Sequence, residues 1–382
     1  MREAVAGDVA GDVTGDVAGD VAADVAADMA EHGLRLSAEE LGVGPCRHER
    51  GPVNAITDVA GVRVGHSTLI EGGDIRTGVT AIVPDGVDRA GGELAAGLFV
   101  GNGFGKLIGA TQLIELGVIE TPIVLTGTLS AFRAADALLS YMLGLPGNEG
   151  LQTCNPVVGE TNDGFLSDIR SRPVTERHVL EAIKGARGGP VAQGCVGAGT
   201  GTAALGFKAG IGTASRVTRP TDGELCTIGV LVQANFSGVL TVDGIQIRPA
   251  QASAHGPGQP GETGQPGETG QPGGNSCMIV VATDGGFDAR QLARIAKRAV
   301  FAMGMTGSEF APGSGDYAIA LDVRPDEQRS DAILGPVFTA TAEATCEALL
   351  NSLFLATTTT GYLGHTRRAV PLDDVKRALA AT

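Results

Sequence analysis

The chain contains no tryptophan, and only 4% of its 382 residues are aromatic, whereas 59 are glycine. A core without large rings has to be built from valine, isoleucine, leucine and alanine, with tight turns and close approaches between backbone segments. Apolar residues make up 43% of the chain and charged residues 19%. This composition is typical of a globular protein, and the length suffices for one large domain or two ordinary ones.

Paired cysteines and long apolar segments are also missing. The six cysteines are scattered and none forms a CxxC pair, which favours reduced thiols in the cytoplasm over a disulfide framework. No stretch reaches the length of a transmembrane helix, and the first residues lack the basic and apolar regions of a secretory signal. We therefore expect a cytoplasmic protein with no membrane partner.

Positive charge is scarce as well. The formal net charge is −15, and residues 1–32 contribute −7 of it through one arginine, two glutamates and six aspartates. The remaining body carries −8 and is still acidic. Because an acidic surface repels the phosphate backbone, we expect no nucleic-acid partner.

Two low-complexity segments divide the chain. Residues 4–30 repeat a tetrapeptide of the type GDVA, which would place like charges four residues apart on a helix, so we expect a disordered acidic tail over residues 1–34. Residues 256–274 read GPGQPGETGQPGETGQPGG, and such a proline- and glycine-rich repeat is typical of a solvated tether. We therefore expect a single domain over residues 35–382, with a flexible linker at 252–274.

Patterns typical of strands and of helices alternate from residue 53 onward. Helices that bracket sheets favour a layered α+β sandwich. The apolar spacing predicts helices at residues 107–116, 131–145, 175–186, 289–303 and 340–355. Runs rich in β-branched residues predict strands at 79–83, 123–125, 227–234, 238–247, 278–283 and 317–323, with a hairpin formed by 227–234 and 238–247.

Several familiar catalytic motifs are absent. No GxSxG elbow occurs, which excludes an ordinary α/β-hydrolase. No HExxH pattern or paired cluster of histidine and carboxylate indicates a metal. The segment GNGFGK at 101–106 is followed by Leu107, where a phosphate-binding loop needs serine or threonine. We therefore expect neither a cofactor nor a metal.

The end of the tether is the most informative position. Asn275, Ser276 and Cys277 join it to the apolar run that begins at Met278. Cleavage before Ser276 would give that serine a free α-amine, and the unperturbed pKa of such an amine, roughly 7.7–8, suits a base for the neighbouring hydroxyl. Because a serine after such a loop more often caps or turns the chain, the other residues have to decide.

Further small polar residues lie in glycine-rich turns beside predicted strands. Asn235 and Glu160 each end an apolar run, and Ser314 and Asp316 precede the predicted strand from Tyr317. Each of them alone is typical of a turn or a cap. Together with a nucleophile they supply what amide hydrolysis without histidine requires: a hydroxyl and carboxylate pair, and a donor for the oxyanion.

Eight segments in a fixed order carry a resemblance to a known family. They are GPVNAITDVAGVRVGHSTL (51–69), RTGVTAIVP (76–84), GNGFGKLIGATQLIELG (101–117), NPVVGETNDGFLSDI (155–169), GCVGAGTGTAALGFKAGIGTAS (194–215), VLVQANFSG (230–238), NSCMIVVATD (275–284) and GSGDYAIAL (313–321). From about residue 51 to its end, the chain resembles the DmpA-type L-aminopeptidase/D-Ala-esterase/amidase and β-peptidyl aminopeptidase family.

The resemblance implies a four-layer αββα sandwich similar to that of N-terminal nucleophile hydrolases. It also implies that an inactive precursor cuts itself between Asn275 and Ser276 into an α chain, 35–275, and a β chain, 276–382. The processed αβ units of this family assemble as homo-oligomers, and we expect a tetramer.

Position by position, the resemblance implies a role for each residue of the set. Ser276 matches the catalytic nucleophile, and Ser314 with Asp316 matches a hydroxyl and acid pair beside it. Asn235 matches a donor to the oxyanion, and Glu160 matches a carboxylate that binds the free amine of the substrate. Some relatives have a tyrosine close to the last position as a second oxyanion donor, but residues 161–164 of this chain contain none.

The implied activity is that of a self-cleaving serine aminopeptidase. It would release N-terminal residues from peptides, amides or esters through an acyl-enzyme on Ser276. Two alternatives stay open: a self-processing acyltransferase of the ornithine acetyltransferase type, and a non-catalytic binding protein on the same fold. The acyltransferase uses a threonine, so Ser276 argues against the first, and the intact set of polar residues argues against the second.

Overall fold

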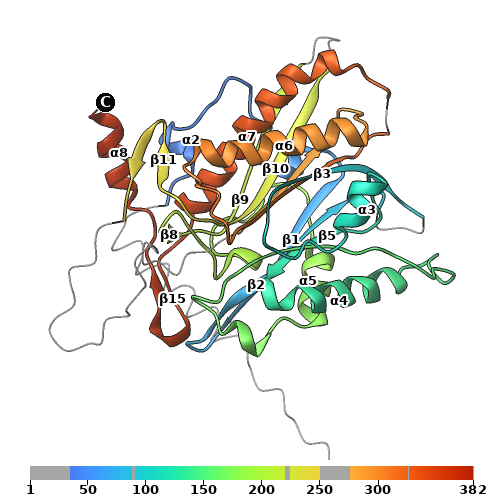
Figure 1. Cartoon of the computed structure of the whole chain (residues 1–382), viewed down its shortest axis with the longest axis horizontal. Helices are drawn as coiled ribbons and strands as arrows, with labels where there is room; N and C mark the ends of the chain where they lie inside the picture. Colours follow the sequence, from blue (N-terminus) through green and yellow to red (C-terminus); the bar gives the residue numbers. More distant parts are fainter. Residues whose placement is uncertain (1–34, 88–90, 220–223, 250–275, 326, 382) are drawn as a thin grey trace, which may run out of the picture.

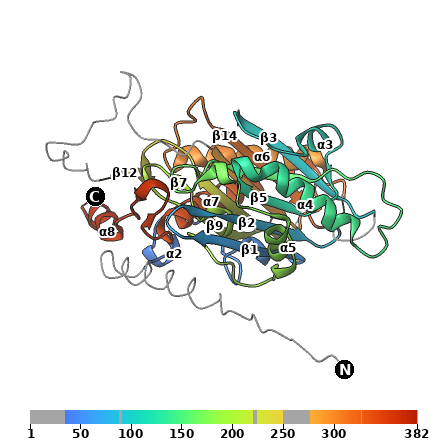
Figure 2. The same cartoon turned by 90° about the horizontal axis from the view of Figure 1, so that it is seen from below.

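Two sheets stack face to face, and helices cover the outer face of each (Figures 1 and 2). The structure is a computed structural model that describes residues 35–87, 91–219, 224–249, 276–325 and 327–381. The acidic tail at 1–34, the tether at 252–274 and Asn275 lie outside the described residues. The predicted four-layer α+β sandwich is confirmed within the described part of the chain.

The larger sheet has six strands in the order β4-β3-β14-β13-β10-β9. Strands β13 and β14 run parallel, and every other neighbouring pair is antiparallel. Helices α6 (Ala289–Met305) and α7 (Leu334–Phe354) cover its outer face. The strands are β4 (Val118–Ile119), β3 (Leu94–Gly103), β14 (Gly315–Asp322), β13 (Ser276–Thr283), β10 (Cys226–Asn235) and β9 (Ile211–Thr218).

The smaller sheet has four strands in the order β1-β2-β5-β6. Its outer face packs against α4 (Ala131–Leu143) and α5 (Glu176–Gly185), which lie below the strands in Figure 1. Strands β5 and β6 are parallel, and the other two pairs are antiparallel. The strands are β1 (Val62–Glu71), β2 (Ile75–Pro84), β5 (Ile123–Gly127) and β6 (Val157–Thr161).

Short elements complete the described chain. The remaining helices are α2 (Ala38–Leu41), α3 (Ala110–Glu115) and α8 (Leu372–Ala380). Three small hairpins pair β7 (Ala203–Ala204) with β8 (Phe207–Lys208), β11 (Leu240–Val242) with β12 (Ile245–Ile247), and β15 (Thr359–Thr360) with β16 (Thr366–Arg367). The single-turn helices η2 (Thr128–Ser130) and η4 (Gly197–Gly199) flank the sheets.

Three sequence predictions need correction. Residues 238–247 do not pair with β10, because β9 and β13 occupy both of its edges; they form the separate β11–β12 hairpin, whose turn has Asp243 and Gly244 at positive φ. The helix predicted at 107–116 is only Ala110–Glu115, since Gly109 has φ 89° and breaks the first turn. The helix predicted from residue 340 already begins at Leu334.

Glycines let helices approach the sheets closely. A Cβ on Gly212 of β9 would lie 1.9 Å from the Ala348 carbonyl oxygen of α7. A Cβ on Gly65 of β1 would lie 2.1 Å from the Ala182 oxygen of α5. Aliphatic side chains then fill the three apolar layers between helices and sheets and between the two sheets. This packing explains how a chain with so few aromatic residues builds its core.

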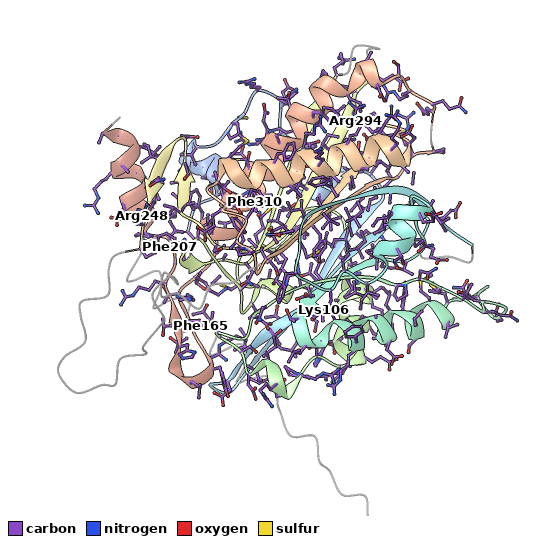
Figure 3. All side chains as sticks on the ribbon, in the orientation of Figure 1. Lys106, Phe165, Phe207, Arg248, Arg294 and Phe310 are labelled. Atoms are coloured by element: carbon purple, nitrogen blue, oxygen red, sulfur yellow. The ribbon has the colours of Figure 1, made fainter. Side chains whose placement is uncertain are left out.

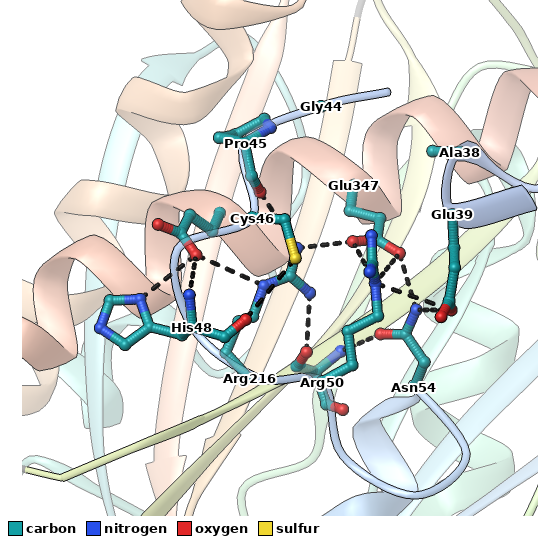
Figure 4. A network of polar contacts seen from close by, with 12 residues as sticks. Ala38, Glu39, Gly44, Pro45, Cys46, His48, Arg50, Asn54, Arg216 and Glu347 are labelled. Carbon is teal, nitrogen blue, oxygen red and sulfur yellow. Dashed lines mark hydrogen bonds and ion pairs between the residues drawn. The ribbon is translucent and has the colours of Figure 1, made fainter. Parts of the chain in front are cut away.

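A buried ion-pair network ties the segment before β1 to α7 (Figure 4). Arg216 of β9 is fully buried, and its guanidinium donates to Glu347 Oε2 at 2.5 Å and lies 3.5 Å from Glu343 Oε2. Arg50 and His48 of the incoming segment contact the same two carboxylates. Each buried charge therefore has an opposite charge beside it, which such burial requires.

We predict that Gly212→Ala lowers the free energy of unfolding by about 3 kcal/mol, because the new methyl group must displace the backbone of α7. Gly335→Ala is the matched control: it lies in α7, and no atom lies within 4 Å of its added Cβ. There we expect no loss, or a gain of about 0.5 kcal/mol from helix propensity. Urea unfolding of both variants measures the difference, and equal stabilities would contradict the close-packing argument.

Candidate active site

The pairing of β13 decides which residues surround Ser276. Ser276 is the first residue of this strand; it lies opposite Asn235 of β10 and beside Gly315 of β14. The Gly315 N–H donates a hydrogen bond to Ser276 Oγ at 3.3 Å. Ser276 is only 3% exposed. The ends of three neighbouring strands therefore bring together residues that are far apart in the chain.

A hydroxyl and carboxylate pair lies at the start of β14. Ser314 Oγ donates to Asp316 Oδ1 at 2.7 Å, while Asp316 Oδ2 has no hydrogen-bond partner among the described residues. Asn102 lies opposite Asp316 in register but donates from Nδ2 to the carbonyl oxygens of Phe310 (3.1 Å) and Ala311 (2.8 Å). Burial raises the pKa of Asp316 above its ordinary value, and the interactions with Ser314, Asn102 and the Cys277 N–H oppose this shift.

The side-chain amide of Asn235 is held at both ends. Its Oδ1 accepts a hydrogen bond from the Ala203 N–H at 3.0 Å, and its Nδ2 donates to the Asn162 carbonyl oxygen at 2.9 Å. Asn235 is 1% exposed. An amide nitrogen carries two N–H groups, so one N–H remains available to a substrate oxygen.

Glu160 is the penultimate residue of β6 in the smaller sheet. Its Oε1 accepts a hydrogen bond from the Lys106 N–H at 2.8 Å, and its Oε2 accepts one from the Thr128 hydroxyl. The Lys106 ammonium lies 3.8 Å from Oε1, and Figure 3 shows Lys106 near the middle of the molecule. Glu160 is 3% exposed, and these three contacts compensate the burial of its charge and fix the position of the carboxylate.

The two sheets touch directly where Glu160 and Ser276 lie. A Cβ on Gly159, the residue before Glu160, would lie 2.5 Å from Cε of Met278 in β13. A larger residue at Gly159 would therefore have to displace the end of the Met278 side chain, which packs between the two sheets. This contact brings the ammonium-binding candidate of one sheet to the nucleophile candidate of the other.

Tyr317 connects the two halves of this region. A Cβ on Gly315 would lie 3.1 Å from its ring carbon Cε2. A Cβ on Gly105 would lie 3.2 Å from the Tyr317 hydroxyl and 3.3 Å from Glu160 Oε1. Both oxygens therefore lie next to Gly105. Burial, followed by the charges of Glu160 and Asp316, raises the pKa of Tyr317. Tyr317 is therefore a hydrogen-bond donor at neutral pH.

The structure gathers every residue that the sequence singled out, apart from Asn275, which lies outside the described residues. Ser276, Asn235, Ser314 and Asp316 meet at adjacent strand ends, and Glu160 approaches from the facing sheet. Sequence reasoning missed the contacts that surround these side chains, which come from Lys106, Thr128, Asn162, Ala203 and Tyr317. Tyr317 was within a quoted motif, but only the pairing of β14 reveals its neighbours.

The described residues form neither a metal site nor a membrane-spanning helix. Outside the gaps in the description, no group of three or more histidine, cysteine, aspartate or glutamate side chains is placed to hold a metal ion. Among the described helices, none combines the length and the apolar character needed to cross a bilayer.

Comparison with protein families gives a match that covers most of the chain. Residues 54–367 match the model described as peptidase family S58. A curated relative, the beta-peptidyl aminopeptidase BapA of Sphingosinicella xenopeptidilytica, is 39% identical over 372 residues, which span 90% of this chain and 91% of the relative.

Solved structures agree with this match. The PH0078 protein of Pyrococcus horikoshii is 39% identical, with a TM-score of 0.80 over 91% of this chain and 99% of that chain. The L-aminopeptidase D-Ala-esterase/amidase of Ochrobactrum anthropi is 33% identical, with a TM-score of 0.78 over 90% of this chain and 98% of that chain. It is described as a prototype for the serine aminopeptidases and as a new variant among the Ntn hydrolase fold.

The burial of Asp316 predicts a pH dependence of stability. Because its folded pKa lies above the unfolded value of roughly 3.9, the folded protein binds this proton more tightly than the unfolded chain does. The resulting stabilisation is complete below that unfolded value and is lost as the pH rises through the folded pKa.

Asp316→Asn cannot ionise, so its free energy of unfolding should improve relative to that of the wild type as the pH rises from about 4 to about 8. Urea unfolding of both proteins at the two pH values measures this. A difference between them that does not change with pH would contradict the assignment.

Proposed function

The chain belongs to peptidase family S58, and from this membership and the geometry of the site we propose that it cuts itself between Asn275 and Ser276 and then acts through the new N-terminal serine. It is a hydrolase, a serine aminopeptidase with the fold of N-terminal nucleophile enzymes. The observation that carries the proposal is the position of Ser276: it opens a central strand, and its hydroxyl oxygen accepts the Gly315 N–H. Because the members of a peptidase family hydrolyse peptide bonds, this membership favours the aminopeptidase over the acyltransferase and over the non-catalytic binding protein.

Self-cleavage proceeds through an ester. Ser276 Oγ attacks the carbonyl carbon of Asn275, the C–N bond between the two residues breaks, and the acyl group moves from nitrogen to oxygen. Water then hydrolyses the ester. This leaves a carboxylate on Asn275 and a free α-amine on Ser276, and it divides the chain into residues 35–275, which follow the acidic tail, and residues 276–382.

Turnover repeats this chemistry on a substrate. The α-amine accepts the proton of the Ser276 hydroxyl while Oγ attacks the first carbonyl of the substrate. The second N–H of Asn235 Nδ2 stabilises the oxyanion, a contact that typically supplies about 2.7–4 kcal/mol of transition-state stabilisation. The leaving group departs with a proton, and water then releases the acyl group from Ser276.

Ser314 and Asp316 assist the α-amine of the processed enzyme. When this amine takes up a proton it becomes a cation, and a nearby carboxylate favours that form. Asp316 Oδ1 accepts from Ser314 at 2.7 Å, and the Asn102 side chain and the Cys277 N–H also lie close enough to favour the charged form of the carboxylate, although neither makes a hydrogen bond of good geometry to Oδ2. The pair can therefore orient the hydroxyl and still offer one carboxylate oxygen to a new donor.

Glu160 binds the free ammonium group of the substrate. Its carboxylate is held by Lys106 and Thr128, and the Tyr317 hydroxyl lies beside it. A fixed carboxylate in the strand that packs against β13 selects substrates whose first residue carries a charged amine. We infer that the substrates are small peptides, amides or esters with a free N-terminal amine, the classes named for the two relatives.

We also propose that the processed αβ units form a homo-oligomer, as a tetramer, in the cytoplasm. Large exposed apolar side chains support assembly, among them Phe104 (71% exposed), Phe132 (64%) and Leu363 (71%). The six cysteines are all free thiols, which supports a reducing compartment.

Ser276→Ala should yield one unbroken chain without activity, because neither cleavage nor acylation can begin. Intact mass under denaturing conditions separates residues 1–275 and 276–382 from the full chain, and native mass spectrometry of the same sample reports the oligomer. Ser330→Ala, a cap of a surface turn, is the control and should be cleaved normally. A cleaved and active alanine variant at 276 would end the proposal.

Glu160→Gln should lower kcat/KM about 10- to 100-fold for a substrate with a free amine, since a charge-assisted hydrogen bond is lost. The same variant should act on the N-acetylated substrate at the wild-type rate. Kinetics on an aminoacyl nitroanilide and its acetylated form measure both values. Glu149→Gln, an exposed carboxylate, serves as the control. Equal losses on the two substrates would contradict ammonium binding by Glu160.

A further inference from the structure

Two buried charged side chains take no part in the proposed reaction. Lys208 of β8 is 0% exposed, and Asp163, three residues after Glu160, is 2% exposed. Burial of a charge is costly unless hydrogen bonds and an opposite charge compensate it. The contacts of Lys208 and Asp163 show which parts of the structure these buried charges hold.

Lys208 holds the segment 199–203 in place. Its ammonium group donates to the carbonyl oxygen of Gly199 at 3.2 Å and to that of Ala209. The Ala209 N–H donates to the Thr202 carbonyl oxygen at 3.2 Å, which closes the β7–β8 turn onto the same segment. This segment ends at Ala203, whose N–H donates to Asn235 Oδ1.

Asp163 holds the segment that contacts Nδ2 of Asn235, the other end of that side-chain amide. Its carboxylate accepts a hydrogen bond from the Thr77 hydroxyl of β2, and its carbonyl oxygen accepts the N–H groups of Leu166 (3.1 Å) and Ser167 (3.0 Å). The residue before it, Asn162, supplies the carbonyl oxygen that accepts from Asn235 Nδ2. Asp163 therefore fixes the position of that carbonyl.

The two segments also touch each other. A Cβ on Gly201 would lie 3.0 Å from Asp163 Cβ, so the segment 199–203 packs directly against the aspartate. Burial raises the pKa of Asp163 to about 6, while the Thr77 hydrogen bond and the Lys208 charge act in the opposite direction. Burial lowers the pKa of Lys208, and the charges of Cys195 and Asp163 oppose that shift. The two charges therefore influence each other, with Cys195 the larger influence on Lys208, and the direct link between the two segments is the packing of Gly201 against Asp163.

We propose that Lys208 and Asp163 are positioning residues for the oxyanion donor: together they fix the segments 162–163 and 199–203, which hold the two ends of the Asn235 side-chain amide. The inference rests on the proposed function of Asn235 and extends it to a buried pair that touches no substrate. Nδ2 of Asn235 has to point at an oxygen that becomes negatively charged only in the transition state. A small displacement of either segment turns this N–H away.

Loss of the pair should therefore affect the chemical step more than substrate binding. We expect Lys208→Met to lower kcat about 10- to 100-fold with KM nearly unchanged, since the lost interaction exists only in the transition state. Asp163→Asn keeps an acceptor for Thr77 and should show a smaller loss of the same kind. Because the two charges act as one unit, the double variant should lose no more activity than Lys208→Met alone.

The test combines substrate kinetics with an aminoacyl aldehyde, which forms a tetrahedral adduct on the serine and needs the oxyanion donor. Rates are normalised to the processed fraction, read from intact mass. The inhibition constant of the aldehyde should rise in step with the loss in kcat, while KM stays constant. Glu347→Gln, in the remote network of Figure 4, is the control for lost stability and should change neither quantity.

Each outcome decides the inference. Wild-type kcat and aldehyde inhibition in both single variants would overturn it, and so would losses that Glu347→Gln reproduces. If Lys208→Met does not fold, Asp163→Asn alone carries the test. An active Asn235→Ala variant would instead refute the proposed role of Asn235, so failure of the proposed function can be told apart from failure of this inference.

Discussion

The register of β13 in the middle of the larger sheet is the constraint on which the site depends. Its backbone pairs with β10 on one side and β14 on the other, so the positions of Asn235 and Gly315 relative to Ser276 follow from main-chain hydrogen bonds. A slip of one residue would turn Ser276 toward the helices and Cys277 toward the facing sheet, because alternate residues point to opposite faces. Such a slip would also exchange the side chains of two packed layers, since Met278 and Val280 lie between the sheets and Ile279 lies under the helices, and overpacked or underpacked cores are destabilised.

Close packing of backbone against backbone then sets the distances across the layers. The glycine Gly212 allows α7 to lie directly on the larger sheet, Gly65 allows α5 to lie on the smaller one, and Gly159 allows the sheets to meet beside Glu160. Side-chain rings would hold these layers further apart. Small residues at these contacts let β6, which carries Glu160, pack directly against β13, which begins at Ser276.

Much of this arrangement could be predicted from the sequence. The apolar runs that become β10, β13 and β14 showed where strands end, and the motifs around Asn235, Ser276 and Ser314 indicated that these ends carry chemistry. The pairing of residues 238–247 was wrong because local pattern does not reveal that both edges of β10 are occupied. The contacts of Thr128 and Lys208 were missed for a similar reason: each depends on a partner in a distant segment, Glu160 and Gly199 respectively, and no short-range pattern encodes such a contact.

The strand order has a consequence for how the processed protein can come apart. Strands β13 and β14 lie between β3 and β10, and both flanking strands precede residue 276 in the chain. In the proposed two-chain form, the smaller chain is therefore enclosed on both sides by the larger one. Unfolding would release two separate polypeptides, and their recombination would depend on concentration, whereas the precursor folds as one chain. The mature enzyme would then persist through the height of its unfolding barrier, a kinetic stability acquired at the moment of cleavage.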